Sequence, residues 1–183
     1  LRCYINMGNN LTNYNYFVMC TLTECVVNGT IPDKFFAYIF ADSTIKNSRL
    51  IINSDLAKYS MFVRCTLEDC IIEKCKVTNF IQNPIKVTGN HILKGVDISN
   101  LFCNFTKDSS ISYEDYIPVI KDNIFDVELT KIYTSITDIL LVDNICKGLS
   151  VNGIPEKKRI GKGNIYTSLS GSFTIESGNL LLS

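Results

Sequence analysis

The sequence predicts an all-β chain in which a right-handed parallel β-helix, or solenoid, is followed by a small mixed or β unit at the C-terminal end. The first observation behind this prediction is a repeat. The phrase Phe-x-x-small-Thr-aliphatic-x-x-small-x-aliphatic begins at residues 17, 40 and 62, which are 23 and then 22 residues apart. The second is a five-residue period of small and aliphatic residues, which fits neither a helix nor a simple alternating strand. Repeats of this length stack as coils and bury a continuous core.

The repeat predicts a parallel β-helix over residues 1–108. Its coils are expected near residues 16–38, 39–61, 62–84 and 85–105. The period is clearest in the third coil, where Cys65, Cys70 and Cys75 are five residues apart. Turn-forming residues are expected at the corners between coils, at Asn28-Gly29, Pro32-Asp33, Asn53-Ser54-Asp55 and Asn83-Pro84.

Small and aliphatic residues at equivalent positions of the repeat are expected to face inward and to stack from coil to coil. The predicted core ladder consists of Cys20, Ser43, Cys65, Cys25, Ser48, Cys70, Leu22, Ile45 and Leu67. Cysteine and serine exchange at these positions, as expected of a small side chain in a tight inward slot. On the outside of the same strands, Thr21, Thr44 and Thr66 should form a column, which we interpret as β-branched residues on an exposed strand face.

The eight cysteines are predicted to be buried free thiols of a protein made in a reducing compartment. Cys20 and Cys65 lie two coils apart, which is about 9–10 Å and beyond the roughly 7 Å reach of a disulfide. A zinc site at Cys65, Cys70 and Cys75 is a weaker alternative, because structural zinc ligands usually have two to four residues between them and come in pairs. A disulfide elsewhere is the other alternative, and no metal or cofactor is predicted.

Residues 109–150 are expected to form a connecting segment. Apolar residues from Val127 to the glycine at position 148 have near-helical spacing, which predicts a helix over 128–147. The same stretch is dense in Ile, Thr and Val, which favour strands. Residues 151–183 predict short strands, such as Ile165–Leu169 and Ser172–Glu176, separated by glycine-containing turns. They are interpreted as a second small unit or the start of a further β domain.

Composition excludes several classes of function. Hydrophobic residues make up 46% of the chain, enough for a sizeable core. Eighteen basic and eighteen acidic residues cancel, which argues against a general nucleic-acid binder or an electrostatic membrane-surface protein. No apolar run approaches the roughly 18 residues of a membrane span. The chain opens Leu-Arg-Cys and stops at Leu-Leu-Leu-Ser, which predicts a segment of something longer or a processed product.

The run from Cys65 to Phe80 resembles pentapeptide-repeat proteins, whose unit is small-x-Leu/Phe-x-x. Coils of 22 and 23 residues are longer than the strict four-unit coil of that family, and they are equally similar to the three-sided β-helix of polysaccharide lyases and phage tailspikes. The coil length, the core of small and aliphatic residues, the polar corners and the low charge resemble the fibre, spike and baseplate components of bacteriophages.

That resemblance implies a non-enzymatic structural or attachment component of a phage virion, such as a fibre, a spike or a tail or capsid appendage. The expected partners are further copies of the chain, with a homotrimer favoured, other virion proteins and host surface glycans. Nucleic acid is not an expected partner. The expected location is the virion, after synthesis in the host cytoplasm, or the cytoplasm if the protein is not viral.

The alternative is a carbohydrate-active enzyme or a glycan-binding β-helix that uses an outward carboxylate face, with Glu24, Glu68 and Asp69 as the candidate catalytic residues. Glu24 and Asp69 would lie two coils apart, near the 6.5–9.5 Å that separates the carboxyl groups of inverting glycosidases. Both fall at bends between strands, where solvated polar residues are the ordinary occupants. A third hypothesis, mimicry of DNA by a pentapeptide-repeat-like protein, needs a strongly acidic face that a neutral chain does not supply.

Two further motifs carry weaker hypotheses. His91 is the only histidine of the chain, so any Cys-His or Ser-His-Asp set would need it. A surface or corner position is the simpler interpretation. Lys157, Lys158, Arg159 and Lys162 form a basic loop that lacks the Gly-Lys-Ser/Thr of a phosphate-binding P-loop. We interpret it as a solvated hairpin loop.

Overall fold

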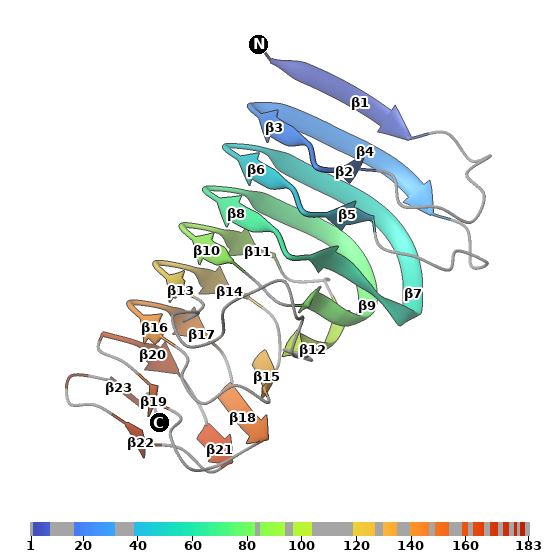
Figure 1. Ribbon diagram of the computed structural model, residues 1–183. Helices are drawn as coiled ribbons and strands as arrows, with labels where there is room; N and C mark the ends of the chain where they lie inside the picture. Colours follow the sequence, from blue (N-terminus) through green and yellow to red (C-terminus); the bar gives the residue numbers. More distant parts are fainter. Residues whose placement is uncertain are drawn as a thin grey trace.

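A computed structural model of the chain shows a parallel β-solenoid (Figure 1). The structure describes residues 2–7, 17–31, 39–82, 85–93, 97–103, 119–126, 130–134, 140–146, 149–153, 159–160, 163–166, 169–171, 174–175, 178 and 180–181. Within these residues every regular element is a strand and there is no helix. The predicted all-β solenoid is therefore confirmed.

The strands follow one another along the stack. The first half contains β1 (Cys3–Met7), β2 (Phe17–Val18), β3 (Thr21–Thr23), β4 (Cys25–Ile31), β5 (Phe40–Ala41), β6 (Thr44–Lys46), β7 (Arg49–Val63), β8 (Thr66–Glu68), β9 (Ile71–Gln82), β10 (Lys86–Thr88), β11 (His91–Ile92) and β12 (Asp97–Cys103). The second half contains β13 (Val119–Lys121), β14 (Ile124–Phe125), β15 (Thr130–Thr134), β16 (Leu140–Val142), β17 (Ile145–Cys146), β18 (Leu149–Gly153), β19 (Arg159–Ile160), β20 (Ile165–Tyr166), β21 (Leu169–Gly171), β22 (Thr174–Ile175) and β23 (Leu180–Leu181).

The strands form a 15-stranded sheet, a six-stranded sheet and a two-stranded pair. The six-stranded sheet has the order β16-β13-β10-β8-β6-β3, so each turn of the solenoid, here called a rung, adds one strand beside the previous one (Figure 1). Thr21 pairs in parallel with Thr44, and Thr44 pairs with Thr66, as the repeat requires. A rung cannot bury its inner face alone, so stacking supplies the core.

The corners are made by single residues with left-handed backbone conformations. One series comprises Met19, Asp42 and Arg64. The other comprises Glu24, Asn47, Asp69, Gly89, Asp122, Asp143 and Gly163, with φ between 48° and 72°. In two places of this second series, which we call the corner column, a side chain lies directly over a glycine: Asp69 over Gly89 and Asp143 over Gly163. A Cβ at either glycine would overlap the carboxylate of that aspartate.

The corner prediction from turn-forming residues is wrong where the structure tests it. Asn28 and Gly29 lie inside β4, and the Asn53-Ser54-Asp55 run lies inside β7. Gly29 serves packing, because a Cβ there would come within 2.6 Å of the Met7 Cβ. Pro32-Asp33 and Asn83-Pro84 lie outside the described residues. A single left-handed residue turns the chain more tightly than the turn motifs that the sequence suggested.

Aromatic rings stack through the core of the first rungs. The ring centroids of Phe17 and Phe40 lie 4.9 Å apart, and those of Phe40 and Phe62 lie 5.0 Å apart, both in stacked geometry. Phe62 meets Phe80 edge-on at 5.1 Å. Phe40, Phe62 and Phe80 are fully buried. Phenylalanine opens each of the first three copies of the repeat, so the stack is a direct product of the 22- to 23-residue period.

The helix expected over residues 128–147 is wrong within the described part of that stretch, which contains β15, β16 and β17. Ile145 faces outward and Cys146 faces inward, so apolar residues occupy both faces of these strands. Their spacing along the sequence therefore resembles that of a helix. The density of β-branched residues was the better guide. The strands β13, β14, β16 and β17 extend the same two large sheets that begin in the first rungs.

Candidate functional site

Inward corners of the first rungs hold small residues that bond to the backbone. Of the predicted core ladder, Cys25, Ser43, Ser48, Cys65, Cys70, Ile45 and Leu67 are buried, and Cys20 and Leu22 are half-buried. The backbone N–H of Cys20 donates to Ser43 Oγ at 3.1 Å, and that of Cys25 donates to Ser48 Oγ at 3.1 Å. The hydroxyl of Ser43 in turn donates to the Ala41 carbonyl at 2.7 Å. These side chains satisfy backbone groups that the corner leaves without a sheet partner.

Asparagine replaces them in the later rungs. Asn90, Asn123, Asn144 and Asn164 are buried at the same corner and form a ladder. Asn90 Nδ2 and the Asn90 backbone N–H both donate to Asn123 Oδ1, at 3.0 and 2.9 Å. Asn90 Nδ2 also donates to the Leu67 carbonyl at 3.0 Å. The equivalent bonds join Asn123 to Asn144 and Asn144 to Asn164, so each amide ties its own rung to the rungs on both sides.

Sequence analysis missed this ladder, although a second repeat marks it. Gly-Asn or Asp-Asn pairs occur at 89–90, 122–123, 143–144 and 163–164, each followed by an isoleucine or histidine. The first residue of each pair is the left-handed corner and the second is the buried amide. Asparagine is usually a turn or surface residue, so the sequence pattern did not lead us to expect asparagines in the core.

The buried cysteines are structural and unreactive. Cys25, Cys65 and Cys70 are buried free thiols, whereas Cys20 is half-buried and Cys3 is exposed, so the prediction of buried cysteines is wrong at Cys3. Burial raises the pKa of Cys65 and of Cys70 to about 11, so both remain protonated at neutral pH. A protonated thiol is a poor nucleophile and a poor metal ligand. Among the residues that the structure describes, no group of three or more His, Cys, Asp or Glu side chains is arranged to hold a metal ion.

Glu68 lies between two lysines on the six-stranded sheet. Its carboxylate is 2.7 Å from Lys46 Nζ and 2.6 Å from Lys86 Nζ. Hydrogen bonds from Lys46 and then Lys86 hold the pKa of Glu68 below its ordinary value. A general acid in a glycosidase needs the opposite shift, toward a raised pKa. Glu68 is therefore poorly suited to donate a proton at neutral pH.

Glu24 and Asp69 share a shallow hollow of about 440 Å³ along the corner column. Arg2, Asn47 and Arg49 also line it. Asn47 stands between the two carboxylates, since the three residues occupy successive rungs of the column. The structure thus brings Glu24 and Asp69 to one hollow and leaves Glu68 on the neighbouring strand. Both carboxylates are exposed at the surface.

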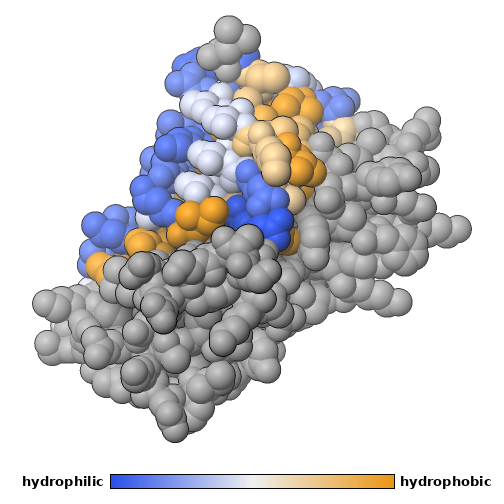
Figure 2. Space-filling view, in the orientation of Figure 1, coloured by the Kyte–Doolittle hydropathy of each residue, from blue (hydrophilic) through white to orange (hydrophobic). Residues whose placement is uncertain are grey.

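The front face of the six-stranded sheet is polar. Thr21, Thr44 and Thr66 point outward in register, and Figure 2 shows this face as a pale band with hydrophilic side chains along one side and hydrophobic ones along the other. Lys46 and Glu68 lie in the next outward column. Glu68 pairs with both Lys46 and Lys86, so this surface is solvated and carries a small excess of positive charge.

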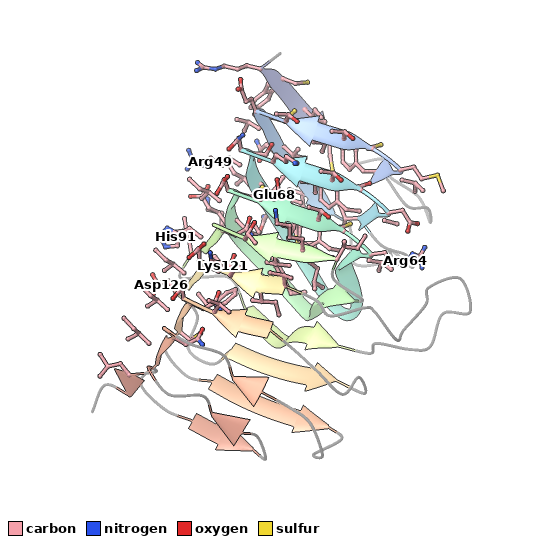
Figure 3. The ribbon with its side chains drawn as sticks, turned by 60° about the vertical axis from the view of Figure 1, so that its left-hand side comes forward. Arg49, Arg64, Glu68, His91, Lys121 and Asp126 are labelled. Atoms are coloured by element: carbon pink, nitrogen blue, oxygen red, sulfur yellow. The ribbon has the colours of Figure 1, made fainter. Side chains whose placement is uncertain are left out.

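A column of outward-facing aliphatic residues runs along the 15-stranded sheet. Ile71 pairs with His91, and the column then continues through Ile124, Ile145, Ile165 and Leu180. We call Ile71, Ile124, Ile145, Ile165 and Leu180 the aliphatic column, and His91 occupies the position between Ile71 and Ile124. Ile71, Ile124, Ile145 and Leu180 are 42%, 40%, 46% and 52% exposed. The column begins one rung below Arg49, and Figure 3 shows Arg49, His91 and Asp126 projecting from the same side of the stack, opposite Arg64.

His91 therefore lies between two isoleucines on an outer surface, where it is half-buried, and no set of catalytic partners surrounds it in the described part of the chain. Of the basic loop, the structure describes only Arg159, in β19, and the hypothesis for its lysines lies outside the described residues. Sequence analysis did not identify the aliphatic column, because outward and inward apolar residues alternate on the same short strands.

No protein-family model, curated protein or solved structure that was compared with the chain matches it. The described residues include no helix that is long and apolar enough to span a membrane.

Proposed function

We propose that this chain is a non-enzymatic structural or attachment component of a larger assembly, such as a fibre, spike or tail or capsid appendage of a bacteriophage virion. The observation that carries the proposal is the aliphatic column. Large apolar side chains that line up on the outside of a folded protein mark a surface that another protein covers. The phage assignment itself rests on the resemblance in coil length, core composition and polar corners.

Self-association is the favoured use of the column. In a cyclic assembly whose axis runs along the stack, every copy presents the same residue at the same height. Ile124 would meet Ile124 and Ile145 would meet Ile145, so aliphatic surface is matched on these rungs, and on the rung between Ile71 and Ile124 His91 would meet His91. Arg49 at the upper end is paired with Glu73 through two hydrogen bonds of 2.7 and 3.0 Å. This pairing lowers the repulsion among arginines of neighbouring copies in a homotrimer.

The test is the mass in solution by light scattering under reducing conditions, over a range of concentrations. We expect the wild type to form a trimer or a larger closed ring. Ile124→Lys should raise the dissociation constant at least about tenfold, since it places a charge at the centre of the contact. Ile85→Lys is the matched control, because Ile85 is 49% exposed but lies outside the aliphatic column.

A wild type that remains monomeric at all concentrations would contradict self-association through the column. So would an equal loss of assembly in the Ile85→Lys control. Thermal unfolding of each variant should accompany the measurement, so that an unfolded variant is not mistaken for a dissociated one.

A carbohydrate-active face is the second candidate, and the shared hollow of Glu24 and Asp69 favours it. If it is correct, Glu24→Gln and Asp69→Asn should each abolish glycan hydrolysis by the purified chain. Glu68→Gln should leave hydrolysis unchanged, because Glu68 is engaged by Lys46 and Lys86 outside that hollow. The absence of any hydrolysis across a glycan panel would reject this candidate.

A further inference from the structure

A second hollow opens on the outward face of β1, β4 and β7, in the first rungs of the solenoid. Its volume is about 370 Å³, and it is lined by Asn6, Asn28, Thr30, Ile51, Asn53 and Lys74. We propose that this amide hollow binds an acidic saccharide, meaning a sugar that carries a carboxylate. The proposal is independent of the assembly function, which uses other residues.

The hollow owes its form to a break in strand pairing. Ile51 pairs with Glu73 and Ser54 pairs with Cys75, so two residues of β7 face the single residue Lys74 of β9. Lys74 has a left-handed backbone, with φ of 55°. A bulge of this kind bends the strand and re-aims the side chain. It brings Lys74 into the lining together with Asn53, which comes from the bulged segment of β7.

Most of the polar side chains in the lining are uncommitted. Within the described chain, the side chains of Asn6, Thr30, Asn53 and Lys74 make no hydrogen bond or ion pair to the protein. Amides and hydroxyls offer both donors and acceptors. A sugar hydroxyl requires both at once, so such a lining is suited to a ligand with many hydroxyl groups.

Lys74 supplies one positive charge to the hollow. Lys74 makes no direct ion pair with the neighbouring carboxylate of Glu73, because Arg49 holds both oxygens of Glu73 at 2.7 and 3.0 Å, although the two charges attract at longer range. Hydrogen bonding by Arg49 lowers the pKa of Glu73, so the Arg49–Glu73 pair stays ionised at neutral pH. A single ammonium is too little for a polyanion such as nucleic acid, which needs several, but it matches one carboxylate.

Tyr4 provides an aromatic surface beside the hollow. Its side chain is 65% exposed, and its hydroxyl accepts a hydrogen bond from Asn28 Nδ2 at 3.1 Å. This bond fixes the ring next to a residue of the lining. An exposed aromatic ring with an anchored polar end can stack on the C–H face of a sugar ring while the amides bond to its hydroxyls.

The size and polarity of the hollow also favour this ligand class. Small-molecule sites have volumes from about 300 Å³ upward, and the amide hollow lies at the lower end, where one or two sugar rings fit. Ile51 and Met7 are the large apolar side chains of the lining, and Met7 is itself buried, so a purely apolar ligand would bury little surface there.

The test is binding of sialyllactose, with lactose as the uncharged comparison, measured by NMR titration of the folded protein. We expect sialyllactose to bind at least about fivefold more tightly than lactose, because only sialyllactose offers a carboxylate to Lys74. Lys74→Asn should weaken sialyllactose about tenfold and change lactose less than about twofold, since asparagine tolerates the left-handed backbone. Asn53→Asp should also weaken the binding of sialyllactose, because the new carboxylate repels the carboxylate of the sugar.

Lys121→Asn is the matched control, because it removes an exposed lysine from the other large sheet. It should leave both affinities within about twofold of wild type. The proposal is overturned if neither sugar binds, if lactose binds as tightly as sialyllactose, or if Lys121→Asn weakens sialyllactose as much as Lys74→Asn does. Light scattering of Lys74→Asn should match wild type, which separates this result from any failure of assembly.

Discussion

The first rungs and the later rungs fill the same inward corner with different chemistry. The buried residue that follows the left-handed corner is a cysteine or serine in the first rungs and an asparagine in the later ones. The series is Cys25, Ser48, Cys70, Asn90, Asn123, Asn144 and Asn164. The two sets meet where the Cys70 backbone N–H donates to Asn90 Oδ1 at 2.9 Å. The backbone corner is the same on both sides of this junction, with one left-handed residue before the buried one. The corner therefore requires a small side chain with a polar atom, and a thiol, a hydroxyl or an amide can each fill it.

The two regions distribute their stabilising interactions differently. Cys70 Sγ donates to the Ile45 carbonyl at 3.4 Å, and Asn90 Nδ2 makes the equivalent bond to Leu67 at 3.0 Å. The amide also bonds to the next rung, which a thiol does not do. The first rungs compensate with the stacked phenylalanines and with a second inward corner at Cys20, Ser43 and Cys65. Packing dominates the first region, and hydrogen bonding carries more of the second.

The largest expected effect comes from breaking the packing. Phe62→Ala should lower the free energy of unfolding by about 3–5 kcal/mol, because Phe62 is fully buried and touches Phe40 and Phe80. Phe17→Ala should cost clearly less, since Phe17 is half-buried at the end of the stack. Urea unfolding followed by circular dichroism measures both. Equal losses of unfolding free energy in the two variants would contradict the expectation that the buried middle of the stack contributes more than its end.

Exchanging the two corner chemistries should have unequal results. Asn90→Cys should cost about 2–3 kcal/mol, because the Cys70 N–H loses its buried acceptor and Asn123 Oδ1 loses one of its two donors from residue 90. Cys70→Asn should stay within about 1 kcal/mol of wild type, since the Ile45 carbonyl is already placed to accept from an amide. Chemical denaturation of the two variants tests this, and matching losses would contradict the proposed asymmetry.

At alkaline pH the thiols of the first rungs should lower the stability of the fold, whereas the asparagine ladder should not. The folded-state pKa of Cys65 and of Cys70 is about 11 and the ordinary value is 9.0. A raised pKa stabilises the fold fully below the ordinary value, and this contribution is lost as pH rises through 9 toward 11. The loss should be about 1 kcal/mol per thiol at pH 10.

The matched variant is Cys65→Ser with Cys70→Ser, because serine already occupies these columns at Ser43 and Ser48 and does not titrate. Unfolding measured between pH 8 and 10 should show a smaller decline for this variant than for wild type. An identical decline would mean that these thiols do not control the alkaline stability. The asparagine ladder contains no titratable group, so it contributes nothing to the slope.

The smallest effect is expected on the polar face. Glu68→Gln should change stability by about 0.5 kcal/mol or less, because the two lysines that pair with Glu68 are about half exposed. The lowered pKa of Glu68 stabilises the fold above the ordinary carboxyl pKa, and this contribution disappears as pH falls through the lowered value. NMR titration of the Glu68 carboxyl should therefore show its pKa rising toward normal in Lys46→Ala.

The sequence predicted the parts of this molecule that repeat with the same residue types. Cysteine, serine and phenylalanine return at fixed positions in the first rungs, so the solenoid and its pairing register could be derived from them. The later rungs keep the geometry but change the residue to asparagine, and their short strands carry isoleucine outside as well as inside. Local periodicity therefore suggested a helix over 128–147, where the chain forms strands.

Candidate sites were harder to predict, because they depend on which residues neighbouring rungs bring together. Glu24 and Asp69 were correctly placed at outward bends, yet their common hollow and the separate engagement of Glu68 follow from the direction of each side chain. The amide hollow depends on the bulge opposite Lys74. No pattern within β7 or β9 alone reveals it, because a bulge is a property of the pairing between two strands.

The aspartates that lie over Gly89 and Gly163 restrict which residues the next rung can hold at the same corner. A mutation that gives either glycine a side chain forces the carboxylate of the aspartate one rung earlier to move aside, and it also places a side chain on a left-handed backbone. Losing the aspartate first removes that overlap, so the order of the two substitutions matters. A chain of this kind can lengthen by copying rungs, but the copies do not then diverge independently. Loss of the aspartate should therefore be tolerated before loss of its glycine, and the reverse order should be disfavoured.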